Sequence, residues 1–253
     1  MPAGKARSVT LTCPNTAVAL HAAPVRMPRG VRVAKSLPGD EVRRWTLRFA
    51  SVAHKTRKVK AVVRCVRLDL PAAVTGVTVR VNTTSLPGLR VRAGATRQTA
   101  LRCPPGYVPT GQGVGASTRA LSLVAAVPNG RGWVFRIKNR GDSAAGASVS
   151  IRCLKRVVAG RRGGARETLA FGVKRVAYDF PISSGKNRSV SGACARDRFS
   201  LGTGISLDPA DDISLMRSFP SARRAAWWFF NNAGPPEPVT AYVLCLARGS
   251  RFN

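Results

Sequence analysis

Six cysteines, spaced at nearly equal intervals in three pairs, constrain this chain more than any other feature. The pairs are Cys13 and Cys65, Cys103 and Cys153, and Cys194 and Cys245. Counted from the residue numbers, the separations within the pairs are 52, 50 and 51 residues. A recurring interval of this kind indicates an internal repeat, and we expect each pair to form one disulfide that closes one repeat.

Two other residue types keep nearly fixed distances from these cysteines. An arginine stands six residues before each first cysteine, and a tryptophan stands 18 to 20 residues before each second cysteine. The arginines are Arg7, Arg97 and Arg188, and the tryptophans are Trp45, Trp133 and Trp227. We predict that the tryptophans lie in the cores. The arginines recur, which makes them the candidate residues for a structural or contact role.

The sequence within each repeat is typical of β-strands. Arg7–Cys13 alternates β-branched and polar residues, as expected of a half-buried strand. The 24 glycines and 17 prolines are scattered and indicate many turns, and no long stretch has a helical period. We therefore predict an all-β chain of three tandem small β-sandwich modules, each closed by one disulfide. Immunoglobulin sandwiches also pin two sheets with a bridge beside a buried tryptophan, an analogy of architecture and not of topology.

The repeat also sets the boundaries of the modules. Two connectors separate them, and both contain strand-like stretches, Val77–Val81 and Leu169–Val173. Long loops without structure are uncommon, so we expect these stretches to complete a sandwich or to pair between modules. The predicted division is module 1 at 1–70, a connector at 71–93, module 2 at 94–157, a connector at 158–184 and module 3 at 185–253.

The cysteines fit disulfides better than they fit metal or catalytic chemistry. Structural zinc sites use clustered cysteines a few residues apart, and the sequence has no such cluster. A catalytic cysteine needs a histidine partner, and the chain has only His21 and His54. A bridge that closes a loop of this length stabilises a fold by ~4 kcal/mol. We predict no catalytic site, no metal site and no cofactor, and hence no enzymatic activity.

A group of glycines follows the third cysteine. Gly111, Gly113 and Gly115 resemble a phosphate-binding loop, but no helical pattern follows them. Gly202 stands at the same distance from its cysteine as Gly111, and His21 takes that place in the first repeat. A position that is glycine in two repeats indicates a backbone requirement, such as a bulge or a tight crossing of strands.

Three of the eleven acidic residues stand close together in the sequence. Asp208, Asp211 and Asp212 form the only acidic cluster of the sequence. A calcium loop needs more oxygen ligands at a stricter spacing. We therefore interpret the cluster as a solvated loop or a contact with a basic neighbouring copy.

The chain carries a large positive charge along its whole length. Lysine and arginine number 42 against 11 acidic residues, which gives a net charge of +31. Residues 1–70 and 71–160 each carry +12, and residues 161–253 carry +7. Such a field attracts polyanions, so the candidate partners are nucleic acid, an anionic cell-wall polymer and an acidic protein shell. The densest basic runs, at 57–60 and 161–164, lack the interleaved aromatics of nucleic-acid modules, which argues against readout of base sequence.

The start of the chain bears on where the protein is made. No segment is apolar over the ~18 residues that a membrane helix requires, and residues 1–8 lack the pattern of a signal peptide. Such a start fits either a removed leader or synthesis in the cytosol, and Met1 favours the second. Disulfides, in contrast, persist in oxidising surroundings. A virus particle reconciles the two, because it is assembled inside a cell and spends its life outside.

The second repeat carries a family resemblance. It runs Cys103-Pro-Pro-Gly, then Gly111-Gln-Gly, Trp133, and a closing Cys153-Leu. This order resembles the β-module repeats of exported or virion-surface proteins of high-GC Gram-positive bacteria and their phages. The third repeat keeps the two glycines but has Cys194-Ala-Arg-Asp, and the first repeat lacks the glycines. The resemblance implies a β module and a surface location, with no chemistry attached.

Three hypotheses of function follow. The first is a structural protein of a phage particle, such as a capsid decoration or cement protein that clamps an acidic shell and contacts other copies of itself in a large assembly. The second is a secreted or cell-wall-associated protein that binds an anionic polymer. The third is a sequence-blind nucleic-acid-binding protein. None involves a membrane or a small-molecule substrate.

Overall fold

Strands and turns, with no helix, make up the described part of the chain. The structure is a computed structural model. It describes the whole chain except residues 1–4, 16, 29, 52–55, 67–73, 76–79, 163–164, 208–212, 222, 233, 248–250 and 253. Twenty-one strands lie in the described residues, and the predicted all-β class is therefore confirmed.

Most of the strands fall into three segments that follow the three cysteine pairs. The first segment, residues 6–66, contains β1 (Ala6–Thr12), β2 (Val18–Arg26), β3 (Val31–Pro38), β4 (Arg44–Ser51) and β5 (Lys60–Val66). The second segment, residues 81–155, contains β7 (Val81–Val91), β8 (Thr96–Arg102), β9 (Tyr107–Ala116), β10 (Leu121–Asn129), β11 (Gly132–Asn139) and β12 (Ala145–Lys155). The third segment, residues 172–247, contains β15 (Gly172–Ile182), β16 (Asn187–Ala193), β17 (Arg198–Leu207), β18 (Ile213–Pro220), β19 (Arg224–Asn231) and β20 (Glu237–Ala247).

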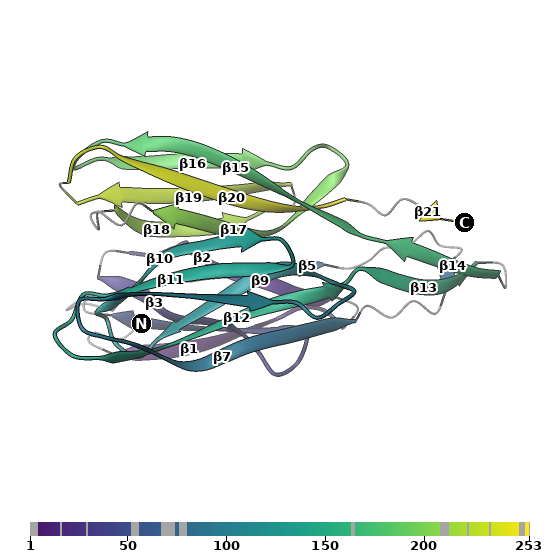
Figure 1. The fold of residues 1–253 in the computed structure, drawn as a ribbon, viewed down its shortest axis with the longest axis horizontal. Helices are drawn as coiled ribbons and strands as arrows, with labels where there is room; N and C mark the ends of the chain where they lie inside the picture. Colours follow the sequence, from purple (N-terminus) through teal and green to yellow (C-terminus); the bar gives the residue numbers. More distant parts are fainter. Residues whose placement is uncertain are drawn as a thin grey trace.

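Four further strands form a sheet of their own. They are β6 (Val74–Thr75), β13 (Val157–Arg162), β14 (Ala165–Ala170) and β21 (Arg251–Phe252). The hairpin of β13 and β14 extends away from the three segments (Figure 1).

Equivalent strands of the three segments pair in the same way. In the third segment, β16-β19-β18 form one antiparallel sheet, and β15, β20 and β17 pair in another. The second segment repeats this arrangement with β8-β11-β10 and β7-β12-β9. The first segment has β1-β4-β3 and the shorter pair β2-β5. The layered arrangement of these sheets is visible in Figure 1.

The predicted tryptophans lie at the centre of three hydrophobic clusters. Trp45, Trp133 and Trp227 are each at most 1% exposed. Each begins an alternation along β4, β11 or β19 that buries every second side chain, as a strand with one face on a core requires. Burying a large apolar side chain stabilises a fold by about 1.5–3 kcal/mol, so these strands hold the cores together.

The cysteine pairs that the spacing predicts are joined in the structure. The bridges are Cys13–Cys65, Cys103–Cys153 and Cys194–Cys245. In each segment the first cysteine follows the first strand of one sheet, and the second lies in a strand of the other sheet. Each bridge therefore links two sheets beside a buried tryptophan.

Buried asparagines fix the turn after the tryptophan strand in two segments. Asn139 donates from Nδ2 to the carbonyl oxygens of Val91 and Ser143, at 3.1 and 2.8 Å. Asn231 donates in the same way to Ile182 and Pro235, at 3.1 and 2.9 Å. Because these asparagines tie the turn to the preceding strands β7 and β15, they hold those strands in the fold.

The segments join through equivalent strands. Strand β3 of the first segment pairs with β9 of the second through Lys35↔Gly115 and Ser36↔Val114. Strand β10 of the second pairs with β17 of the third through Ala125↔Ser206 and Ala126↔Ile205. Strand β18 of the third packs against β2 of the first, and β2, β9 and β17 contact one another. The three segments thus close into a ring.

Glycines are required where these strands cross. A Cβ atom on Gly111 would overlap the carbonyl oxygen of Leu20 on β2, and one on Gly202 would lie 2.8 Å from the carbonyl oxygen of Thr110 on β9. Side chains do not fit at such approaches. The prediction of a tight crossing of strands at this glycine position is confirmed.

The two connector stretches differ in part from the expectation. Most of the stretch Val77–Val81 lies outside the described residues, and its last residue, Val81, is the first residue of β7. The stretch Leu169–Val173 is not one strand, because β14 ends at Ala170 and β15 begins at Gly172. Strands β7 and β15 each pair with the last strand of their own segment, β12 and β20, as expected of stretches that complete a sheet. The acidic cluster Asp208, Asp211 and Asp212 lies outside the described residues.

Candidate basic groove

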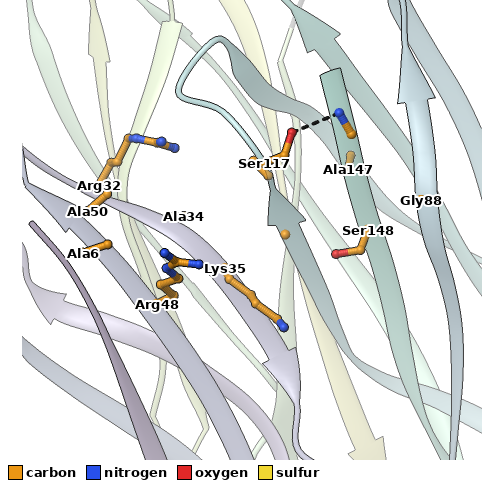
Figure 2. A pocket seen from close by; sticks show the side chains of 13 residues that line it. Ala6, Arg32, Ala34, Lys35, Arg48, Ala50, Gly88, Ser117, Ala147 and Ser148 are labelled. Atoms are coloured by element: carbon orange, nitrogen blue, oxygen red, sulfur yellow. Dashed lines mark hydrogen bonds between the residues drawn. The ribbon is translucent and has the colours of Figure 1, made fainter. Parts of the chain in front are cut away.

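A groove crosses all six strands of the sheet β1-β4-β3-β9-β12-β7. Its floor is hollow because small residues occupy most of the positions that line it. The lining residues, which define the basic groove, are Ala6, Arg32, Ala34, Lys35, Arg48, Ala50, Gly88, Gly115, Ala116, Ser117, Gly146, Ala147 and Ser148. Figure 2 shows Arg32, Lys35 and Arg48 on one side of the groove and Ser117 and Ser148 on the other.

The cations of the groove come from two neighbouring strands. Lys35 on β3 pairs directly with Arg48 on β4, and Arg32 lies on the same strand as Lys35. Like charges that face each other across two strands destabilise a sheet. The described lining contains no acidic side chain that would offset them. Partial burial, together with the charge of Arg119, lowers the pKa of Arg32.

A bulge brings these cations to one face. Along a regular strand, Arg32 and Lys35 would point to opposite faces, because they are three residues apart. The register of β3 shifts between Val33 and Lys35, and this bulge turns Lys35 to the face of Arg32. The positive charge of the groove therefore depends on a backbone irregularity.

Two hydroxyl groups face the cations. Ser117 accepts a hydrogen bond from the backbone N–H of Gly146 on β12, at 3.0 Å. Ser148 lies further along β12, on the same side of the groove (Figure 2). Guanidinium, ammonium and hydroxyl groups together donate hydrogen bonds to carboxylate or phosphate oxygens. The described lining has no carboxylate, so its cations and hydroxyl groups can bind an anion.

The arginines that recur in the sequence lie elsewhere. Arg7, Arg97 and Arg188 are exposed, and none of them lines the groove. Their partners across the sheet, Phe49, Ile137 and Phe229, occupy equivalent core positions. Arg188 also donates to the carbonyl oxygen of Pro181 at 2.6 Å and lies over the Phe180 ring. The structure brings Arg188 into contact with its own segment, and the contact role of all three stays a prediction.

The sequence offered little sign of the groove. Arg32, Lys35 and Arg48 stand in no dense basic run, and their meeting needs both the β3 bulge and the pairing of β3 with β4. The basic run at 57–60 lies just before β5, and its last residue, Lys60, is the first residue of that strand. None of its residues lines the groove. In the sequence, the only sign of the groove is the number of alanine and glycine residues in the strands that line it.

The described residues contain no cluster of three histidine, cysteine, aspartate or glutamate residues that could hold a metal ion. Within the same part of the chain, no helix has the length and hydrophobicity to cross a membrane.

No protein-family model matches this chain, and a search of curated proteins finds no match. The function therefore rests on the geometry of the chain itself.

Proposed function

We propose that this chain is a non-enzymatic structural protein of a virus particle, a decoration or cement protein that binds an acidic shell. The basic groove carries the proposal. It holds Arg32, Lys35 and Arg48 on one sheet face, and no acidic side chain is among its described lining residues. The opposed cations Lys35 and Arg48 cost stability in the free protein. Carboxylates of an acidic partner would offset that cost and fix the register of binding.

We infer that the three segments are three tandem β-sandwich modules built on residues 1–70, 94–157 and 185–253, and that β7 and β15 from the two connectors complete the second and the third. Each segment has its own bridge, its own buried tryptophan and strands in two sheets, which supports this division. Connection into a ring gives the chain an approximate threefold arrangement. A ring of this kind matches a shell site at which three subunits meet, and several weak contacts then add up to strong binding.

The disulfides support a location outside the reducing cytosol. Six cysteines form three bridges, and the chain leaves none free. Such bridges persist in oxidising surroundings. We propose the virion surface as that location.

A second candidate is binding of an anionic polymer at the cell wall by a secreted form. One observation favours it: the groove runs over six strands and is lined by small residues and cations. A linear polyphosphate-like chain could follow such a path without specific contacts.

The test is binding of the purified, oxidised protein to capsids of its own virus, measured by co-sedimentation at increasing salt. We expect saturable binding at a fixed ratio to the shell protein. Lys35→Gln/Arg48→Gln should weaken it about tenfold. The matched control is Arg102→Gln/Arg131→Gln, which removes the same charge from exposed positions outside the groove.

Four results would overturn the proposal. Absence of capsid binding would do so, and so would equal weakening by both double variants. Binding to poly(glycerol phosphate) but not to capsids would establish the second candidate instead. Tight binding to DNA of any sequence, lost to the same extent in both variants, would point to a diffuse nucleic-acid-binding protein.

A further inference from the structure

A second hollow lies where the three segments meet. It is lined by β2 and β3 of the first segment, β9 and β10 of the second, and β17 and β18 of the third. We call it the central pocket. Its volume is about 490 Å³, which is within the range of pockets that bind small molecules. Figure 1 shows these strands in the middle of the molecule.

The pocket lies where few backbone pairs join the segments. Only two residue pairs connect β3 to β9, and only two connect β10 to β17. Strands β2 and β18 belong to different sheets. All six of these strands contribute side chains to the lining of the pocket.

The inner wall of the pocket is mostly apolar, although His21, Gln112 and Ser122 also line it. Leu121, Ile205, Leu207 and Ile213 line it, and each of these side chains is at most 6% exposed. They come from strands of the second and third segments. Apolar walls of this kind favour the hydrocarbon part of a ligand over water.

The rim of the pocket is cationic. Arg32, Arg119 and Arg140 line it, one from the first segment and two from the second, and Arg119 and Arg140 are exposed. No acidic residue is among the described residues of the lining. Arg32 and Arg119 lie close enough for their charges to repel, which contributes to the lowered pKa of Arg32. An anion between the guanidinium groups would relieve this repulsion.

We propose that the central pocket binds a small amphipathic anion, with its apolar body against the inner wall and its carboxylate at the three rim arginines. Thr203 and Ser218, whose hydroxyl groups are 2.6 Å apart, also line the pocket. Their hydroxyl groups can donate a hydrogen bond to a polar group on the apolar body of the ligand, or accept one from it. The groove and the pocket share Arg32, Ala34 and Ala116, but Arg119 and Arg140 line the pocket alone, so ligand binding can be tested separately from the proposed shell binding.

The probe is decanoate, and decyltrimethylammonium has the same chain with the opposite charge. Isothermal titration of the oxidised full-length protein should show saturable binding of decanoate, at least tenfold tighter than that of the cation. Arg119→Gln/Arg140→Gln should weaken decanoate binding at least tenfold. The control Arg131→Gln, an exposed position outside the pocket, should leave it unchanged.

Folding of the variants is checked separately by near-ultraviolet circular dichroism, and decanoate should also raise the Tm of the native protein in a concentration-dependent way. The proposal is overturned if decanoate gives neither saturable heat nor a rise in Tm, or if it binds no more tightly than the cation. Equal binding by native protein and a well-folded double variant would also overturn it.

Discussion

The contact between β9 and β2 and the contact between β2 and β17 join equivalent strands in different ways. At the first, Gly111 of β9 lies against the backbone carbonyl oxygen of Leu20 on β2. At the second, the position equivalent to Gly111 is His21 of β2. Its Nε2 lies 3.5 Å from the side-chain Oγ1 of Thr203 on β17.

The difference teaches what a glycine does at a crossing. Where two backbones touch, the position admits no side chain. Where they stand apart, a side chain fills the gap, and here it is a histidine that is 5% exposed and packs edge-on against Trp45. One repeat position thus serves as a backbone contact twice and as a core position once.

The largest effect is expected from a methyl group at the tightest crossing. Gly111→Ala should destabilise the protein by more than about 4 kcal/mol, because the new Cβ overlaps backbone that cannot move without breaking the strand contact. Gly202→Ala, whose Cβ would lie 2.8 Å from the nearest oxygen, should cost less. Urea unfolding of the oxidised proteins measures both. Equal costs would show that the two crossings are alike.

Arg64 and Arg152 each stand directly before the second cysteine of their repeat, and they test how much side-chain hydrogen bonds between segments stabilise the ring. Arg152 is 1% exposed and donates from one nitrogen to the carbonyl oxygens of Gly39, Glu41 and Arg44, each at 3.1 Å. Arg152→Leu should cost about 3 kcal/mol, because those carbonyls lose their donor. Arg64→Leu should cost about 1 kcal/mol, since Arg64 donates to Ser200 across the ring and is less buried. The midpoints of denaturant unfolding, compared at a constant m-value, measure the loss of stability in both variants. A larger loss for Arg64→Leu than for Arg152→Leu would contradict this order.

The contact between His21 and Thr203 should be sensitive to acid. Burial lowers the pKa of His21 from 6.5 to about 4. The unfolded chain therefore binds a proton at a higher pH than the folded one, and stability is lost as the pH falls from 6.5 through 4. The loss should approach about 3 kcal/mol. His21→Gln should remove this slope from unfolding curves at pH 4 to 7. A slope that persists in His21→Gln would assign it to other groups.

The smallest effect is expected in the groove. Lys35→Gln removes one of two opposed cations and should stabilise the protein by about 0.3 kcal/mol at low salt, and less at high salt. Lys174→Gln is the control, because Lys174 is exposed and lies opposite Cys245 and not opposite a cation. Thermal unfolding at two salt concentrations separates the two variants. Destabilisation by Lys35→Gln would show that the pair is not repulsive.

The sequence predicted what repeats and missed what joins the repeats. Cysteine and tryptophan spacing anticipated the three bridges and the buried Trp45, Trp133 and Trp227, because a core demands large side chains at fixed intervals. The alternation along Arg7–Cys13 anticipated strand β1, but the prediction that this strand is half-buried was wrong, because all but one of its side chains are exposed.

The joints left no comparable signal. Lys35 and Ser36 meet β9 through backbone atoms, which any residue possesses. The bulge in β3 that assembles the groove is likewise a backbone feature, so the recurring arginines were a better guide to the repeat than to the site. The central pocket could not be foreseen, because its walls come from three distant parts of the chain.

The ring also orders events during synthesis. Strand β2 begins at Val18, and its partner β18 begins at Ile213, 195 residues later. At about 5–20 residues per second, the ribosome needs roughly 10–40 s to make that interval. During this time Ala22, Ala23 and the rest of β2 that faces the pocket have no covering strand. The nascent first segment therefore exposes apolar surface on β2 until β18 of the third segment has been made.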